Sequence, residues 1–189
     1  MSRIYLIRHA KPASTWGDHD DDPGLDETGH EQARAAAQAL LALPESERPT
    51  KVVSSPLRRC RETAEPFAQA LGIPVEIDPA VGEIPTPRAL PAEARGAWLT
   101  KAFTGAWREI EGDLDYDQWR RAVAMAVAGR GNTAVFSHFV AINAVLSLIS
   151  NDDRVIAFRP DHTSMSILEV GKGGLTLVER GREAATGVL

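Results

Sequence analysis

Short apolar runs separated by helical segments constrain the fold of this chain more than any other feature. The runs 2–8, 51–54 and 133–137 have the length and composition of buried strands, and segments with helical periodicity lie between them. Parallel strands need long crossover connections of this kind, because a tight hairpin reverses the chain direction. We therefore expect an α/β fold: a three-layer sandwich with a mostly parallel central sheet and helices on both faces.

The C-terminal part of the chain predicts an antiparallel edge for this sheet. Residues 164–170 and 175–178 flank a Gly-Gly pair, and we expect them to form a hairpin. Residues from about 84 to 130 instead indicate a helical excursion away from the sheet. The excursion is predicted to contain one helical segment that starts at Thr86 and a second that starts at Asp115.

Composition excludes several classes of protein. A charged fraction of 25% and a hydrophobic fraction of 43% are typical of soluble globular chains, and residues 1–189 suffice for a single domain. The net charge of −5 argues against a nucleic-acid binder, and no apolar stretch approaches the roughly 18 residues of a spanning helix. The lone Cys60 excludes an intramolecular disulfide, and Met1 leads directly into the first strand without a signal-peptide pattern. We expect a cytoplasmic protein that binds neither nucleic acid nor membrane. Its oligomeric state stays open, with a homodimer as one option.

Chemically useful side chains follow the predicted strands where each strand ends. Arg8-His9 comes directly after the apolar run 4–7, and Ser137-His138 closes a later run. In open α/β sheets, ligands bind at the carboxyl ends of the strands. Arginine offers phosphate oxygens a fixed charge and forked donors, and a neutral imidazole can attack phosphorus. The pattern indicates phosphoryl chemistry on a histidine.

The segment 54–64, with the sequence SSPLRRCRETA, adds a helix start to the same edge. Ser55 is a good N-cap and Pro56 a good first residue, so we expect a helix over 57–71. The first turn of this helix would present backbone N–H groups and the Arg58 side chain to an anion. The neighbouring Arg59 and Arg61 would point to other helix faces, and we expect them on the surface or in packing.

With Arg8-His9, the Ser-Pro-Leu-Arg segment, Glu83 and Ser137-His138, the chain resembles the histidine phosphatase superfamily, which includes the cofactor-dependent phosphoglycerate mutases. The resemblance covers nearly the whole chain, with motifs from residue 3 to about 150. It implies a metal-independent phosphomonoesterase of the histidine acid type that needs no cofactor, binds a small phosphorylated substrate and works through a phosphohistidine intermediate. Phosphosugars, phosphorylated cofactor precursors and phosphoproteins all remain open as substrates.

The resemblance also implies a role for each motif residue. His9 would be the nucleophile, and Glu83 would be the general acid that protonates the leaving oxygen. Arg8, Arg58 and His138 would bind the phosphate and take part in catalysis. His9 must be neutral to attack, whereas His138 should be protonated once phosphate is bound. A general acid must hold its proton, so we expect a raised pKa for Glu83.

Other residues near this edge are weaker candidates. Ser14, Thr15 and Trp16 lie in the polar loop 11–26 and could contact substrate. Two further carboxylates, Glu62 and Glu76, are alternatives for the acid, although Glu62 is expected to pair with an arginine of its own helix. Two family glycines are replaced here, by Ala10 after the nucleophile and by Phe139 after the second histidine.

Three alternatives to hydrolysis stay open. Mutase-type phosphoryl transfer is disfavoured because Trp16 precedes Gly17 rather than asparagine, and because the Arg-Tyr-Gly-containing insertion of the mutases is missing. A non-catalytic protein that binds phosphate ligands would be expected to lack the nucleophile or the acid. A metal-dependent phosphohydrolase would use the run 18–22, DHDDD, whose His and Asp side chains suit a divalent ion.

Overall fold

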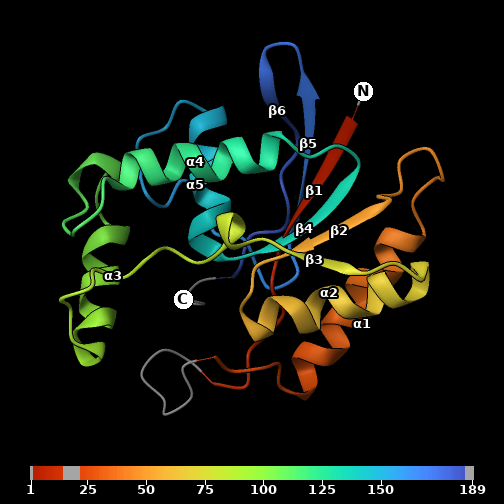
Figure 1. Ribbon diagram of the computed structural model, residues 1–189, viewed down its shortest axis with the longest axis horizontal. Coiled ribbons are helices and arrows are strands. Elements are labelled where there is room, and N and C mark those ends of the chain that lie inside the picture. Colours follow the sequence, from red (N-terminus) through yellow and green to blue (C-terminus); the bar gives the residue numbers. More distant parts are fainter. Residues whose placement is uncertain (1, 15–21, 186–189) are drawn as a thin grey trace.

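A computed structural model describes residues 2–14 and 22–185 of the chain (Figure 1). Within this part, a six-stranded sheet forms the centre, with its strands in the order β3-β2-β4-β1-β5-β6. The strands are β1 (Ser2–Arg8), β2 (Lys51–Ser54), β3 (Val75–Ile77), β4 (Thr133–Ser137), β5 (Met165–Gly171) and β6 (Gly174–Glu179).

The strand directions confirm the predicted mixed sheet. β3, β2, β4 and β1 run parallel, whereas β5 is antiparallel to β1 and forms a hairpin with β6. The register places Arg8 of β1 beside Ser137 of β4, and Ser54 of β2 beside Phe136. Three neighbouring strands therefore end at the same level, and the residues that follow them meet at one edge of the sheet.

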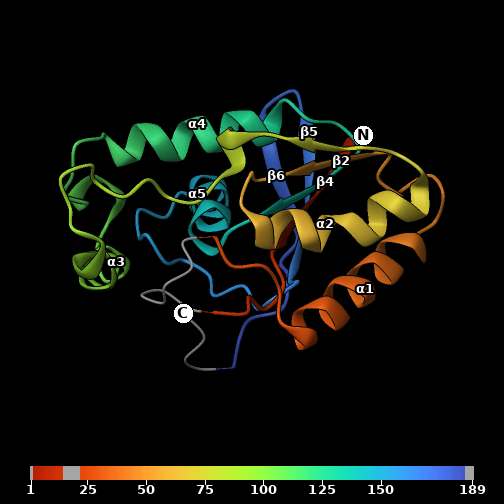
Figure 2. The same cartoon turned by 60° about the horizontal axis from the view of Figure 1, so that its bottom comes forward.

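Helices cover both faces, which gives the expected three layers. Figure 2 shows α1 and α2 together on one side of the sheet, and α4 and α5 on the other. α3 stands apart at one end of the molecule (Figure 1). The helices are α1 (Glu27–Leu41), α2 (Arg58–Leu71), α3 (Arg95–Phe103), α4 (Tyr116–Ala128) and α5 (Phe139–Ile149).

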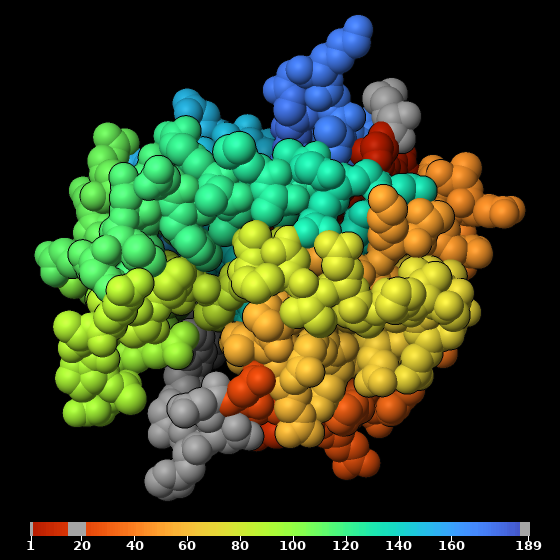
Figure 3. All heavy atoms as spheres, viewed as in Figure 1, coloured from red at the N-terminus to blue at the C-terminus, as the bar shows by residue number. Residues whose placement is uncertain are grey.

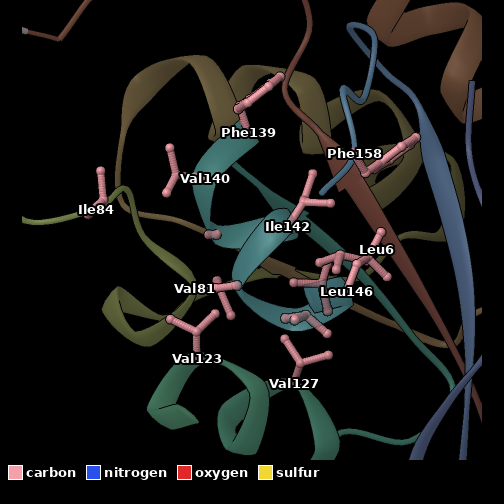
Figure 4. Close-up of a cluster of buried hydrophobic side chains, with 14 of the residues drawn as sticks. Leu6, Val81, Ile84, Val123, Val127, Phe139, Val140, Ile142, Leu146 and Phe158 are labelled. Atoms are coloured by element: carbon pink, nitrogen blue, oxygen red, sulfur yellow. The ribbon is translucent and has the colours of Figure 1, made fainter. Parts of the chain in front are cut away.

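The central strand β1 is buried on both faces. Ile4 and Leu6 point into the apolar cluster beneath α4 and α5, whereas Tyr5 and Ile7 join the cluster beneath α1 and α2. Figure 4 shows the first cluster, with side chains from β1, α4 and α5 directed toward one another. Each such side chain contributes about 1.5–3 kcal/mol when it is fully buried. The strand that leads to Arg8-His9 is thus held firmly in place.

The start of α2 differs from the prediction by one residue. The helix begins at Arg58 with Leu57 as its N-cap, and no side chain caps it. The Ser55 hydroxyl accepts a hydrogen bond from the backbone N–H of Leu57 at 3.3 Å, just ahead of the helix, and it also lies 2.7 Å from the Nε2 atom of His138. The predicted end at Gly72 is confirmed, since this residue adopts a left-handed conformation (φ 66°) that glycine tolerates.

Two helices, α3 and α4, lie in the region of the predicted helical excursion. α4 begins after Asp115, whose carboxylate accepts a hydrogen bond from the backbone N–H of Gln118, as its sequence predicts. Between Thr86 and Pro91 the chain forms no helix, and α3 begins only at Arg95. Two prolines follow Thr86 in this stretch and restrict the backbone away from the helical region. In Figure 3, α4 lies across the face in view, next to the segment that follows β3.

None of the helices within the described ranges has both the length and the apolar composition needed to cross a lipid bilayer.

Candidate active site

The edge formed by β1, β4 and β2 gathers five side chains from four separate segments. Arg8 and His9 end β1, and His138 follows β4. The first turn of α2 and the loop after β3 add one arginine and Glu83 to the same place. Together, these groups bring cationic, imidazole and carboxyl chemistry to one buried point at the carboxyl edge of the sheet.

His9 is held in one tautomer by its own neighbour. Its Nδ1 atom lies 2.8 Å from the backbone oxygen of Ala10, which can only accept, so Nδ1 carries the proton and Nε2 keeps its lone pair. The side chain is buried, and this burial lowers its pKa well below the usual 6.5, with help from His138, Arg59 and Arg8. The imidazole is therefore neutral, with a free nitrogen suited to nucleophilic attack.

His138 lies beside His9, with a distance of 5.4 Å between the two ring centroids. Its Nδ1 atom is 3.2 Å from Nη2 of Arg59, and its Nε2 atom is 2.7 Å from Oγ of Ser55. A guanidinium only donates, so a neutral His138 accepts at Nδ1 and donates from Nε2 to Ser55. Burial, followed by Arg59 and Arg8, lowers the pKa of His138, whereas a bound phosphate dianion would raise it.

Glu83 is the carboxylate of this cluster. Its Oε2 atom lies 3.4 Å from Nδ1 of His138 and 3.5 Å from Nη2 of Arg59, and only 9% of the side chain is exposed. Burial raises the pKa of Glu83 above its usual value, although Arg59 opposes the shift. A raised pKa is what the sequence prediction of a general acid requires. Glu62 pairs with Arg58, and Glu76 pairs with Arg130 on the surface, so neither joins the cluster.

Arg8 spans the floor of the cluster. Nη1 donates to the backbone oxygen of Pro160 at 2.9 Å, and the guanidinium lies 5.1 Å from the centre of the Phe139 ring. Its Nε–H is buried and has no hydrogen-bond partner in the described part of the chain. Burial lowers the pKa of Arg8 to about 10, so the side chain stays charged at neutral pH. A buried donor of this kind can be satisfied by an anion.

The structure corrects the arginine expected from α2. Arg58 points outward, with 55% of its side chain exposed, and its Nε donates to Oε1 of Glu62 at 2.6 Å. Arg59 enters the site instead, with 10% of its side chain exposed. The two arginines differ because neighbouring residues of a helix point in different directions. Arg59 lies one turn before the buried Thr63, on the same face of α2, whereas Arg58 lies one turn before the acidic Glu62 and pairs with it.

The loop candidates are only partly covered by the described residues. Ser14 is half-buried, and its hydroxyl has no hydrogen-bond partner among these residues. The predicted substrate contacts Thr15 and Trp16, and most of the acidic run 18–22, lie outside them. The residues that are described contain no group of three or more His, Cys, Asp or Glu side chains that could hold a metal ion.

Both glycine replacements fit without strain. Ala10 is fully buried, and it is absent from the described non-glycine residues with positive φ, so its Cβ meets no backbone conflict. Phe139 places its ring beneath Arg8 and begins α5. The aromatic face attracts the guanidinium and fills the floor that a glycine would leave open.

Sequence reasoning missed three contributors. Arg59 was expected on the surface or in packing, yet its i,i+4 relation to the buried Thr63 could have identified it. Ser55 was expected to cap a helix. His162, from the turn before β5, has its ring centroid 5.7 Å from that of His9. No feature of the sequence near His162 predicts this contact, since it depends on the antiparallel pairing of β5 with β1.

Two curated proteins are similar to parts of this chain. Over 117 residues the chain is 33% identical to the transcription factor tau 55 kDa subunit of Saccharomyces cerevisiae, a match that covers 56% of this chain and 26% of that protein. Over 89 residues it is 35% identical to the Probable phosphoglycerate mutase GpmB of Photorhabdus laumondii, covering 44% of this chain and 39% of that protein. The matches thus span well under two thirds of both curated relatives.

Solved structures share the fold over the full length. A mycobacterial glucosyl-3-phosphoglycerate phosphatase superposes with a TM-score of 0.70 at 22% identity, covering 97% of this chain and 100% of that chain. A phosphoserine phosphatase from Entamoeba histolytica, solved with 3-phosphoglyceric acid, gives a TM-score of 0.73 at 19% identity, covering 96% and 98%. The family model of the histidine phosphatase superfamily (branch 1) matches residues 4–182, and the chain belongs to this superfamily.

Proposed function

We propose that this protein hydrolyses phosphomonoesters through a phosphohistidine intermediate on His9. The observation that carries the proposal is the neutral, buried imidazole of His9, whose Nδ1–H is bonded to Ala10 while Nε2 keeps its lone pair. Arg8, Arg59 and His138 surround it with donors suited to phosphate oxygens. Membership of the superfamily supports the same chemistry.

The first half-reaction forms a nitrogen–phosphorus bond and breaks the ester bond. Nε2 of His9 attacks phosphorus, and the ester oxygen leaves with the proton of the Glu83 carboxyl group. The positive charge that develops on the imidazole is stabilised by the backbone oxygen of Ala10 at Nδ1. The arginines and a protonated His138 bind the equatorial oxygens, where charge is spread in the transition state.

The second half-reaction returns the protein to its starting state. Water attacks the phosphorus, the Glu83 carboxylate takes a proton from that water, and the nitrogen–phosphorus bond breaks with its electron pair returning to Nε2. Glu83 thus acts once as acid and once as base. Its position within 3.4 Å of His138 supports this role, because it places the carboxyl group beside the phosphate-binding donors.

We infer a small phosphorylated substrate and no requirement for a metal or cofactor. The names of the phosphatase and mutase relatives fit a small phosphorylated metabolite. The described residues supply enough donors to neutralise one phosphate without an added ion. The cytoplasmic location and the single domain stay predictions of the sequence, and the oligomeric state stays open.

A labelling experiment with p-nitrophenyl phosphate tests the proposal. The protein is expected to hydrolyse this ester in the presence of EDTA, and ³²P-labelled substrate should leave alkali-stable, acid-labile label on His9 in a rapid quench. His9→Ala should lower kcat by about 10⁴-fold or more, because the nucleophile is lost. His30→Ala, on the exposed side of α1, is the matched control and should keep full activity.

Each other outcome contradicts a stated part of the proposal. Activity that EDTA abolishes would indicate a metal-dependent hydrolase. Interconversion of phosphoglycerates faster than release of phosphate would indicate a mutase. Phosphate binding by calorimetry, without turnover of any ester in a broad metabolite panel, would indicate a non-catalytic binding protein.

A further inference from the structure

The turn 160–164 forms hydrogen bonds with the end of β1, on the side opposite β4. The backbone N–H of Thr163 donates to the oxygen of Arg8, and the N–H of Arg8 donates to the oxygen of Ser164, both at 3.1 Å. Pro160 accepts from the Arg8 side chain. This turn therefore contacts the residue that precedes the nucleophile through both main chain and side chain.

The turn holds a conformation that its residues do not favour. Thr163 has φ 56°, in the left-handed region that a β-branched residue rarely adopts. Its hydroxyl donates to the backbone oxygen of His162 at 2.7 Å, and Arg182 donates to the same oxygen at 3.2 Å. These contacts offset the strain, and they fix the direction in which the His162 side chain leaves the turn.

His162 directs its ring to the backbone of the nucleophile. Its Nδ1 atom lies 3.2 Å from the backbone oxygen of His9, which can only accept, so Nδ1–H is the donor. Burial, followed by the charge of Arg8, lowers the pKa of His162 to about 4, which leaves the ring neutral at neutral pH. Nδ1 is then the ring's only donor, and it is used on His9.

The peptide group between His9 and Ala10 is thereby fixed at both ends. The His162 ring donates to the His9 oxygen of this peptide. The Ala10 N–H of the same peptide donates to Oγ1 of Thr63 at 2.9 Å. The next carbonyl along the chain, that of Ala10, sets the tautomer and orientation of the His9 ring. A rotation of this peptide plane would move the Ala10 oxygen and misalign the attacking nitrogen.

We propose that His162 is a positioning residue for the nucleophile: its Nδ1–H fixes the His9–Ala10 peptide and, through the Ala10 carbonyl, the attack geometry of His9. The proposal rests on the proposed hydrolysis at His9. It predicts an effect on the rate of phosphoryl transfer rather than on substrate affinity, because His162 acts on the backbone and leaves the phosphate donors in place. Misplacement of a reacting group by about 1 Å can cost about 100-fold in rate.

Two amide variants of His162 distinguish the role of its Nδ1 atom from that of its Nε2 atom. In His162→Asn the amide nitrogen can take the position of Nδ1 and donate to His9, whereas in His162→Gln it reaches the position of Nε2. We expect His162→Ala and His162→Gln to lower kcat for p-nitrophenyl phosphate by about 10- to 100-fold with KM within about threefold. His162→Asn should recover kcat to within about threefold of the wild type. The rate of ³²P labelling of His9 in a rapid quench should follow the same order, and thermal unfolding verifies that each variant is folded.

Three results would overturn the positioning role while leaving hydrolysis at His9 intact. The first is wild-type kcat in folded His162→Ala. The second is equal activity of the Gln and Asn variants. The third is a loss expressed in KM alone, which would make His162 a substrate contact. An inactive wild type would instead overturn the proposed function itself, so the two failures are distinguishable.

Discussion

Two adjacent arginines at the start of α2 end in opposite surroundings. Arg59 belongs to the site floor, which we define as the buried group Arg8, His9, Arg59, Glu83 and His138. Arg58 belongs to the outer rim, which we define as Asp22, Gly24, Leu25, Arg58 and Glu62. In the rim, the Asp22 carboxylate accepts from the backbone N–H of Arg58, and Glu62 accepts from the backbone N–H of Leu25, both at 2.7 Å.

The comparison shows that burial, rather than residue type, distinguishes the arginine that contacts His138 and Glu83 from its neighbour. In the outer rim, water screens the Arg58–Glu62 pair, and such an exposed pair contributes about 0–1 kcal/mol to stability. In the site floor, Arg59 contacts His138 and Glu83 with little solvent, so its charge acts on their protonation. The rim fastens the chain near residues 22–25, and the floor holds the residues to which we assign the proposed chemistry.

The largest expected difference between the two regions comes from removing each arginine in turn. Arg59→Ala should lower kcat/KM by about 10²–10³-fold, because a preorganised donor to the transition state is lost. Arg58→Ala is the matched control one residue away, and it should keep kcat/KM within about threefold and change the free energy of unfolding by about 1 kcal/mol or less. For each variant, steady-state kinetics measures kcat/KM and urea unfolding measures the free energy of unfolding. Equal losses in the two variants would remove the distinction between floor and rim.

Glu83 allows a second test of the floor, based on leaving groups. Glu83→Gln should lower kcat for an alkyl phosphate such as phosphoserine by about 10²–10³-fold, because the leaving alkoxide then lacks a proton donor. The loss for p-nitrophenyl phosphate should be smaller, since p-nitrophenolate is a stable anion.

The pH dependence of activity tests the same role of Glu83, because the direction of the change with pH can be predicted. Burial raises the pKa of Glu83 above its usual 4.5, and the acid must be protonated, so activity on alkyl phosphates should fall as pH rises through that raised value. This falling limb should disappear in Glu83→Gln. If the variant keeps the limb, another group is the acid.

The smallest effect concerns stability at low pH. Burial holds the pKa values of His9 and His138 well below 6.5 in the folded protein. Below pH 6.5 the unfolded chain therefore binds protons that the folded chain does not, and the free energy of unfolding falls as pH falls. Each imidazole contributes a slope of about 1.4 kcal/mol per pH unit.

Urea unfolding between pH 6.5 and 5 measures that slope. His138→Asn should reduce it by about 1.4 kcal/mol per pH unit relative to the wild type. Arg58→Ala, in the outer rim, should leave it unchanged. An unaltered slope in His138→Asn would mean that this imidazole becomes protonated inside the folded protein.

Much of the fold could be predicted because its determinants are local. β1 and β4 are continuous apolar runs, and the Asp115 cap and Gly72 end require only neighbouring residues. The first helix of the excursion was misplaced because Thr86 resembles a helix start, whereas the prolines after it keep the chain extended. The preference of Thr86 for a helix start could not outweigh the restriction that these prolines place on the backbone.

The site could be predicted only where a strand end determined it. Arg8, His9 and His138 lie at the ends of the neighbouring strands β1 and β4, so their meeting follows from the topology, whereas the assignment of Glu83 rested on the family resemblance. The choice between Arg58 and Arg59 depends on which side of α2 packs against the sheet. Neighbouring helix positions point about 100° apart, and Arg59 lies one turn before the buried Thr63, whereas Arg58 lies one turn before Glu62.

The place of β1 in the sheet has a consequence for how the protein becomes active during synthesis. β1 is made before the other strands of the sheet, yet its neighbours are β4, more than 120 residues later, and β5, later still. His9, the proposed nucleophile, therefore leaves the ribosome long before the strands that hold it in place, and a nascent chain without residues 165–171 has no partner on one side of β1. Catalytic competence would then be acquired in a late step of folding, when the last strands close the sheet around the first.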